Sequence, residues 1–120
     1  MKQPPHPAEI VRLLESTRFV LSGEKAVQEK LSATLEAAGI RHRRELEIAP
    51  GDIVDFMIEG GTVIEMKIKA PKRAIYRQCA RYCAHPQVTA LVLATATAIG
   101  FPPEIEGKPC YVASLGRGWL

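Results

Sequence analysis

Two acidic residues and a lysine stand inside apolar, strand-like stretches of this chain. Asp55 lies in the stretch 52–58, and Glu65 and Lys67 lie in the stretch 62–69. Both stretches are rich in β-branched and large apolar residues, and the turn between them contains two glycines, which predicts a β-hairpin. Two carboxylates and an amine brought together on a sheet could hold a metal ion and act on a phosphate.

The length of the turn decides whether the two carboxylates meet. A two-residue turn would pair Asp55 with Met66 and direct its carboxylate away from Glu65. A three-residue turn, 59–61 with Gly61 in the left-handed conformation, pairs Asp55 with Glu65 on a shared face. We expect the three-residue turn because it gathers six large apolar residues on the other face: Val54, Phe56, Ile58, Ile64, Met66 and Ile68.

Two like charges directly opposed on a half-buried sheet destabilise the strand pair. A divalent cation between the carboxylates of Asp55 and Glu65 would remove that penalty. Two hard oxygen ligands with further positions open to water suit Mg²⁺ or Mn²⁺ better than zinc. The pattern therefore indicates metal-assisted hydrolysis of a phosphodiester.

The order and spacing of these residues resemble a known family. Asp55, nine intervening residues and then the sequence EMK at 65–67 resemble the D…ExK core of the PD-(D/E)XK nuclease superfamily. The sequence QCARY at 78–82 resembles the QxxxY element of its RecB-like branch, and the overall size is similar to small Holliday-junction-resolvase-like nucleases. The resemblance covers residues 22–95, and it departs from the family name at Val54, where that name has proline.

The resemblance implies a Mg²⁺-dependent or Mn²⁺-dependent nuclease. In such an enzyme Lys67 would position or deprotonate a water molecule, and Gln78 would orient the lysine or the phosphate. The metal ligands that the resemblance implies are Asp55, Glu65, the Met66 carbonyl and an acidic residue of the first core helix, here Glu24. Glu24 also stands in the first turn of its predicted helix, where an acid stabilises the helix and reaches solvent, so both roles remain open.

Basic residues accompany the helix predicted after the hairpin. Arg73, Arg77 and Arg81 recur every four residues and form a ridge along one side of that helix. With Lys69 and Tyr82 they are the candidate DNA contacts, although a basic ridge is also a common solvated helix face. Gln78 has an alternative as well, a hydrogen bond from its amide to a neighbouring backbone group.

Periodicity and turn residues predict an α/β fold in the order ααβββαββ. The restriction-endonuclease-like sandwich that the resemblance implies has a mixed sheet with helices on both faces. The strand–helix–strand order after the hairpin predicts a parallel, right-handed crossover. The expected helices are 7–16, from the N-cap Ser22 to Gly39, and 71–84; the expected strands are 40–48, 52–58, 62–69, 88–94 and 109–115, with a loop and a short helical turn over 95–107.

The first two helices each contribute an apolar side. In the second helix the predicted core stripe is Val27, Leu31, Leu35 and Ala38; Glu24 falls inside it, and Ser32 faces away. The connector 19–21 is apolar and is expected to pack into the core. Residues 1–7 are proline-rich and are expected to form a disordered or extended lead-in.

Length and composition bound the remaining possibilities. With 120 residues, 47% hydrophobic and 24% charged, the chain is expected to form one soluble globular domain over 1–120. It has no apolar run long enough for a membrane span and no signal-peptide core, so a cytoplasmic protein is expected. Three cysteines, 79, 83 and 110, are too few for a four-cysteine iron–sulfur cluster and are interpreted as small core residues.

The resemblance implies DNA as the partner, with RNA as an alternative, and a net charge of +3 permits such a polyanionic ligand without requiring it. One small domain covers little DNA, which favours structure-selective cleavage and a homodimer.

Two other interpretations of the carboxylates and the lysine remain. One is a non-catalytic nucleic-acid-binding or assembly module that retains the nuclease fold. The other is a surface ion network in which Lys67 and Lys69 neutralise Asp55 and Glu65.

Overall fold

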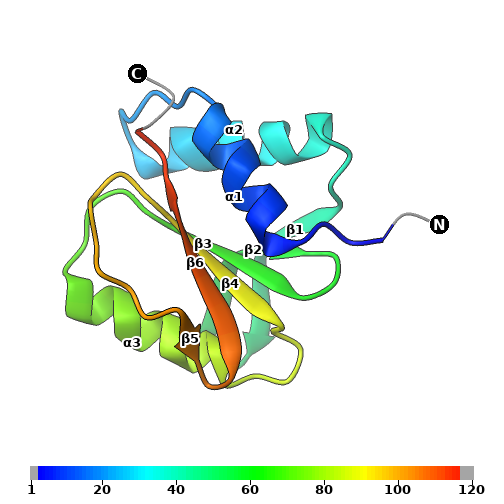
Figure 1. The fold of residues 1–120 in the computed structure, drawn as a ribbon, viewed down its shortest axis with the longest axis vertical. Helices are drawn as coiled ribbons and strands as arrows, with labels where there is room; N and C mark the ends of the chain where they lie inside the picture. Colours follow the sequence, from blue (N-terminus) through cyan, green and yellow to red (C-terminus); the bar gives the residue numbers. More distant parts are fainter. Residues whose placement is uncertain (1–2, 117–120) are drawn as a thin grey trace.

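The alternation of helical and strand-forming segments produces three helices and one six-stranded mixed sheet (Figure 1). The computed structural model describes residues 3–116. The sheet has the strand order β1-β2-β3-β4-β6-β5. The element bounds are α1 Pro7–Ser16, α2 Glu24–Ala37, β1 His42–Ala49, β2 Asp52–Ile58, β3 Thr62–Lys67, α3 Lys72–Cys83, β4 Ala90–Thr95, β5 Glu104–Ile105 and β6 Lys108–Ser114.

The strands change direction where the sequence predicts it. β1, β2 and β3 are antiparallel neighbours, whereas β3, β4 and β6 are parallel. The chain passes from β3 to its parallel neighbour β4 through α3, as the predicted crossover requires. All six residues of β4 are buried, because helices cover both faces of a central strand. β1 lies at one edge of the sheet, and residues 41, 43, 45 and 47 are exposed there.

The turn between β2 and β3 has the predicted three residues. Phe56 pairs with Ile64 and Met57 with Val63, and the same register sets Asp55 opposite Glu65. Gly61 has a φ of +100°, and its amide donates to the Ile58 carbonyl at 2.9 Å. The predicted register, which brings the carboxylates of Asp55 and Glu65 together, is therefore confirmed.

Two apolar clusters lie on opposite sides of the sheet, one under α1 and α2 and the other under α3. Of the six residues expected on one apolar face, Val54 is the exception: it is buried in the cluster under α3. The β2–β3 pairing stops at Phe56, and in β1 Glu45 has a positive φ of 48° between the residues that pair with Phe56 and Val54. The regular alternation of β2 is therefore interrupted between Phe56 and Val54. The first cluster also extends beyond residues 22–95, since it includes Ile10, Leu14, Phe19, Ala113 and Leu115.

Several local predictions are corrected. The N-cap of α2 is Gly23, with extended backbone and no side-chain cap, so the prediction of Ser22 is wrong. Pro71 is the N-cap of α3 instead of its first helical residue. In place of a helical turn, the segment after β4 contains the short strand β5, which pairs with β6. In the connector, Phe19 is buried as predicted, but Val20 is exposed.

Burial along α2 also differs from the predicted helical stripe. Glu24 is exposed in the first turn of α2, where its carboxylate accepts from the Ile68 amide, whereas Ser32 is buried and hydrogen-bonds to His42 at 2.8 Å. At the start of the chain, the His6 ring accepts from the Ala8 amide and caps α1, and Pro7 is already helical. Residues 6 and 7 thus belong to the start of α1; Met1 and Lys2 lie outside the described residues.

Replacing Gly61 tests the turn that sets the register. A Cβ at this position would lie 2.7 Å from the Gln87 carbonyl oxygen, and the backbone is left-handed. We expect Gly61→Ala to lower the free energy of unfolding by about 2 kcal/mol, measured by urea denaturation followed by circular dichroism. Gly100→Ala is the control, because nothing lies within 4 Å of its Cβ position. Equal stabilities for the two variants would contradict this account of the turn.

Candidate active site

The carboxylates of Asp55 and Glu65 lie between β2 and β3, just beyond the last paired residues of the ladder. The Asp55 amide donates to Glu65 Oε1 at 3.2 Å, and the Met66 amide donates to Asp55 Oδ2 at 2.9 Å. Each carboxylate thus accepts a hydrogen bond from the backbone of the opposite strand. The two acidic groups that the sequence singles out are brought together by this exchange.

Lys67 provides the cation beside this pair. Its Nζ lies 3.6 Å from Glu65 Oε2, and its side chain is 23% exposed, whereas that of Glu65 is 1% exposed. Among the ion pairs of residues 3–116, this is the one that involves either carboxylate. One ammonium group opposite two carboxylates leaves a local excess of negative charge when both acids are ionised.

Burial and like charge both disfavour that ionised state. Burial raises the pKa of Glu65 to about 8, the charge of Asp55 adds to the shift, and Lys67 opposes it. Burial also raises the pKa of Asp55, and the charges of Glu24 and Glu45 act in the same direction. The pair therefore favours bound positive charge, either a proton or a cation.

Glu24 is close enough to influence the site but makes a contact of its own. Its Oε2 accepts from the Ile68 amide at 3.4 Å, just after the end of β3. Within the described part of the chain, no three His, Cys, Asp or Glu side chains gather closely enough to hold a metal ion. The two carboxylates that the strand pairing places opposite each other are thus Asp55 and Glu65, and Glu24 lies near them.

Gln78 and Tyr82 connect α3 to β2. Gln78 Nε2 donates to Tyr82 Oη at 2.9 Å, and Tyr82 Oη donates to the Ile53 carbonyl at 2.7 Å. Tyr82 is buried, and this burial raises the pKa of its hydroxyl. The prediction that Tyr82 contacts DNA directly is therefore corrected: the side chain is buried and its hydroxyl holds α3 against β2. Gln78 is half-buried on the flank of α3 that faces β2.

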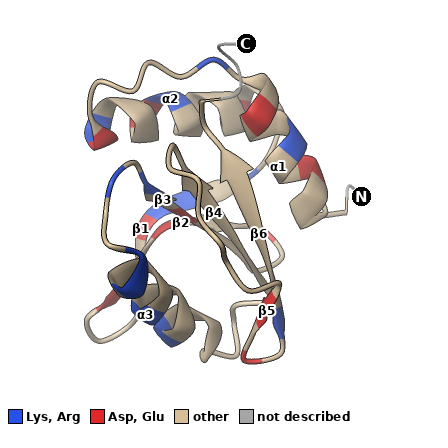
Figure 2. Cartoon of the chain, turned by 60° about the vertical axis from the view of Figure 1, so that its left-hand side comes forward, with Lys and Arg blue, Asp and Glu red and all other residues tan. Residues whose placement is uncertain are grey.

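The basic residues of α3 divide into two groups. Arg73 and Arg77 are exposed and have no ion-pair partner among the described residues. Arg81 instead has its Nε 3.2 Å from Asp52 Oδ1 and its guanidinium over the Tyr82 ring. Figure 2 shows the Lys and Arg positions along α3 and in the segment that leads into it, where Lys69 is exposed.

A small polar cluster at the end of α3 was not predicted from the sequence. His85 Nε2 lies 2.9 Å from Asp52 Oδ2, and together with Arg81 it lowers the pKa of Asp52. The sequence did carry one signal, since Arg81 lies in the last turn of α3 and His85 follows shortly after the end of that helix. Their acidic partner comes from the start of β2, which only the folded chain brings close. This cluster fixes the C-terminal end of α3 against the sheet.

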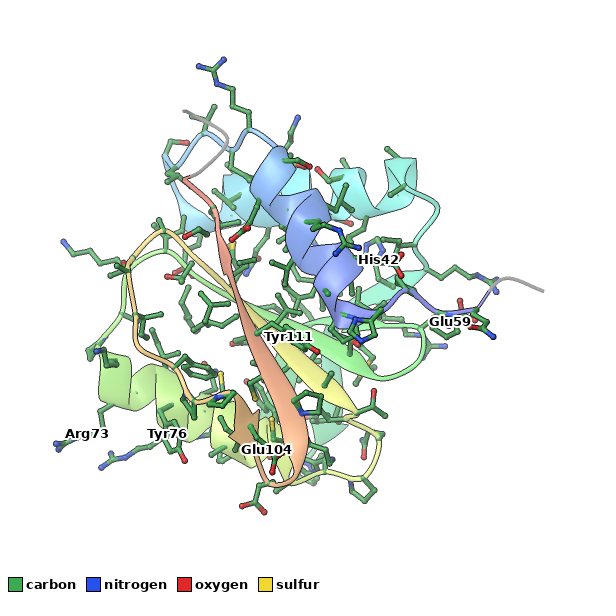
Figure 3. The ribbon with its side chains drawn as sticks, in the orientation of Figure 1. His42, Glu59, Arg73, Tyr76, Glu104 and Tyr111 are labelled. Carbon is green, nitrogen blue, oxygen red and sulfur yellow. The ribbon has the colours of Figure 1, made fainter. Side chains whose placement is uncertain are left out.

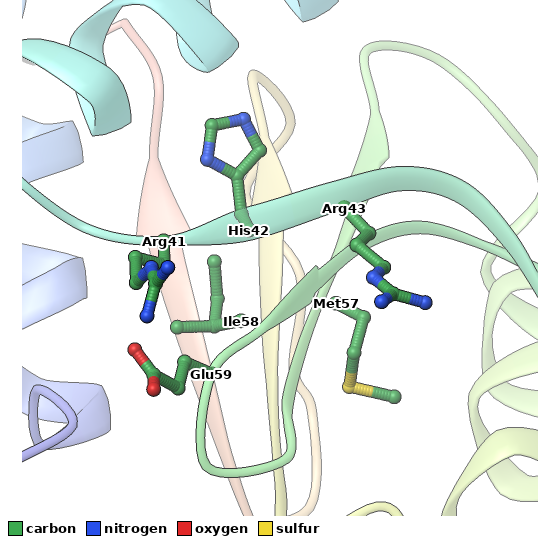
Figure 4. A pocket seen from close by; sticks show the side chains of 6 residues that line it. All are labelled: Arg41, His42, Arg43, Met57, Ile58 and Glu59. Carbon is green, nitrogen blue, oxygen red and sulfur yellow. The ribbon is translucent and has the colours of Figure 1, made fainter.

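The surface also has a hollow of about 430 Å³ along β1 and the end of β2 (Figure 4). Arg41, His42, Arg43, Met57, Ile58 and Glu59 line it. Figure 4 shows His42 pointing away from the other side chains, and its ring is bound by Ser32. Neither carboxylate of the candidate site lines this hollow. The candidate active site is therefore identified by its two carboxylates and its lysine, and not by the volume of a surface hollow.

The three cysteines are free and buried, as the sequence interpretation requires. Cys79 and Cys83 are on α3 and Cys110 is on β6, and all three belong to the cluster under α3. Burial raises the pKa of Cys79 to about 12, so its thiol is neutral. These residues act as small apolar core residues.

Comparisons of the chain with protein-family models, with curated proteins and with solved structures found no match. Among residues 3–116, no helix is both long and apolar enough to cross a membrane. A function is therefore inferred from the geometry and electrostatics of the site.

The raised pKa of Glu65 predicts that stability falls with increasing pH when no metal is bound. Between its ordinary pKa of 4.5 and about 8, the folded chain retains a proton that the unfolded chain releases. The free energy of unfolding should decrease by at most about 1.4 kcal/mol per pH unit in this interval. Thermal unfolding in EDTA across this interval measures the slope. Glu65→Gln should flatten it and the exposed Glu36→Gln should not; an unchanged slope in Glu65→Gln would contradict the assignment.

Proposed function

We propose that this protein is a Mg²⁺-dependent or Mn²⁺-dependent DNA nuclease with a restriction-endonuclease-like fold, hydrolysing phosphodiester bonds. The observation that carries the proposal is the pair of opposed carboxylates, Asp55 and Glu65, with Lys67 as the adjoining cation. The mixed α/β architecture with helices on both faces of the sheet is compatible with this fold.

The donor set fits a magnesium-type ion. Asp55, Glu65 and the Met66 carbonyl would hold it, and Glu24 is the candidate for a further ligand. Mg²⁺ is commonly bound through one or two carboxylates together with water and substrate phosphate, whereas zinc requires more protein ligands than the described residues gather here. When bound, the metal would neutralise phosphate charge and lower the pKa of a coordinated water.

The protein's own groups would complete the reaction. The Lys67 ammonium is partly exposed beside Glu65, where it could orient the attacking water and stabilise negative charge on the phosphate. Gln78 would orient the lysine or the phosphate through its amide, because Tyr82 fixes the helix on which it stands. Arg73, Arg77 and Lys69 are exposed and could bind flanking phosphates, so DNA is the proposed substrate, with a second copy of the chain extending the covered length.

A structural role for the carboxylate pair is the alternative function, and the reciprocal backbone hydrogen bonds favour it. In that case the two acids would replace ladder hydrogen bonds without binding metal. The protein would then be a non-catalytic module with the same fold. Metal binding and cleavage distinguish the two proposals.

Cleavage tests the catalytic proposal directly. With Mg²⁺ or Mn²⁺, the purified protein should cleave members of a panel of single-stranded, duplex and branched DNA. Lys67→Ala should reduce the rate at least about a hundredfold, because it removes the cation beside the carboxylates. Lys30→Ala, an exposed lysine of α2, is the control and should cleave at the wild-type rate. Full metal-dependent cleavage by Lys67→Ala would refute the assigned role.

Metal binding can be tested without a substrate. A cation that binds only the folded chain raises the melting temperature, by about 5–10 °C when its concentration is ten- to a hundredfold above Kd. Differential scanning calorimetry with Mg²⁺, Mn²⁺ or EDTA measures this rise. Asp55→Asn should abolish it, whereas Glu36→Gln should retain it. If wild type melts at the same temperature with and without metal, the structural alternative is supported.

A further inference from the structure

Tyr76 is a large aromatic side chain on the outer surface of α3, and neither the core nor the candidate site uses it. It is 45% exposed, one of three large hydrophobic side chains left exposed in the described part of the chain. Figure 3 shows Arg73 and Tyr76 directed away from the sheet at the same end of α3. The ring of Phe101 meets the Tyr76 ring edge-on with their centroids 6.4 Å apart, which holds the exposed ring in place.

The surroundings of Tyr76 are cationic. Lys72, Arg73 and Arg77 are exposed, α3 contains no acidic residue, and these three side chains have no ion-pair partner among residues 3–116. An aromatic ring between basic side chains provides a face on which a base can stack and charges that bind the adjacent phosphates. This combination is typical of surfaces that bind unpaired nucleotides.

The helix connects this ring to the carboxylates. Successive residues of an α-helix are rotated by about 100°, so Tyr76, Arg77 and Gln78 follow one another around the exposed side of α3. Gln78 is on the flank that faces β2, because it bonds to Tyr82, which bonds to a β2 carbonyl. Tyr76 is on the other flank, against Phe101. A bound strand running from one flank to the other would cross Arg77.

We infer that α3 binds an unpaired DNA strand, with a base stacked on Tyr76 and phosphates on Arg73 and Arg77, and directs it towards Asp55 and Glu65. The destination of the strand rests on the proposed nuclease function, whereas the binding does not. A helix is about 10–12 Å across, and a single strand can bend around it, but a duplex with a persistence length of about 50 nm cannot. Bases inside a duplex are also unavailable to the tyrosine ring. The substrate class is therefore single-stranded DNA or the unpaired tail of a branched molecule.

Fluorescence anisotropy in EDTA tests the binding without cleavage. The probes are fluorescein-labelled 20-nucleotide oligo(dT), a blunt 20-base-pair duplex and the same duplex with an oligo(dT) tail, all at one salt concentration. Wild type should bind oligo(dT) and the tailed duplex more tightly than the blunt duplex. Tyr76→Ala should weaken binding to oligo(dT) about tenfold, whereas Tyr76→Phe should retain it because the stacking face is preserved. Val20→Ala, which shortens another exposed apolar side chain, should bind like wild type.

The outcomes separate this inference from the nuclease proposal. Selective loss in Tyr76→Ala with an unchanged melting temperature supports the inference, even if the protein cleaves nothing. Tighter binding to the blunt duplex, or equal oligo(dT) binding by wild type and Tyr76→Ala, overturns it, even if Lys67-dependent cleavage is observed. If Tyr76→Ala is unstable, the comparison of Tyr76→Phe with Tyr76→Leu decides: equal binding by these two variants overturns stacking.

Discussion

The structure depends on how two buried carboxylates are satisfied at the point where β2 and β3 separate. In a continuous ladder, the amides of Asp55 and Met66 would bond to carbonyls of the neighbouring strand. Here they donate to the side chains of Glu65 and Asp55 instead. These hydrogen bonds offset part of the large free-energy cost of burying two carboxylates. They do not remove the repulsion between the two negative charges. Because this repulsion remains, the pair is a candidate site for binding a cation and not only a local irregularity of the sheet.

The surrounding elements keep this arrangement from relaxing. The left-handed glycine turn sets the register on one side, and the fully buried β4 supports β3 on the other. On the face of the carboxylates, Tyr82 anchors α3 to β2, and the Asp52, Arg81 and His85 cluster fixes the C-terminal end of that helix. Side-chain contacts thus hold the neighbouring elements in place beside the site, where carboxylate geometry must be maintained.

The features that could be predicted from the sequence are those that depend on local periodicity, such as the strands and the register of the hairpin. Alternation and a glycine pair were sufficient for the register of Asp55 and Glu65, because a slip by one residue would have divided the large apolar residues of β2 and β3 between the two faces of the sheet. The same reasoning failed at Val54, because the alternation of β2 is interrupted between Phe56 and Val54, opposite the positive φ of Glu45 in β1. It also failed for Glu24, because a helical stripe gives the direction of a side chain but not whether another element covers it. Arg81 was assigned to a basic ridge, and its partner Asp52 is 29 residues away in sequence. Long-range ion pairs of this kind leave no periodic signal.

The distribution of charge links the two proposals. When both acids are ionised, the site is negative and would repel a phosphate, yet the exposed side of the adjacent helix carries unpaired arginines that would attract one. An anion alone would pair with the arginines of α3 but would leave the carboxylates without a counter-charge. A cation alone would neutralise the carboxylates but would not bind the arginines. A nucleic-acid strand together with a divalent ion satisfies both, because the ion neutralises the acids and the phosphates meet the arginines. An exposed aromatic ring among those arginines then adds a contact that only an unpaired base can use.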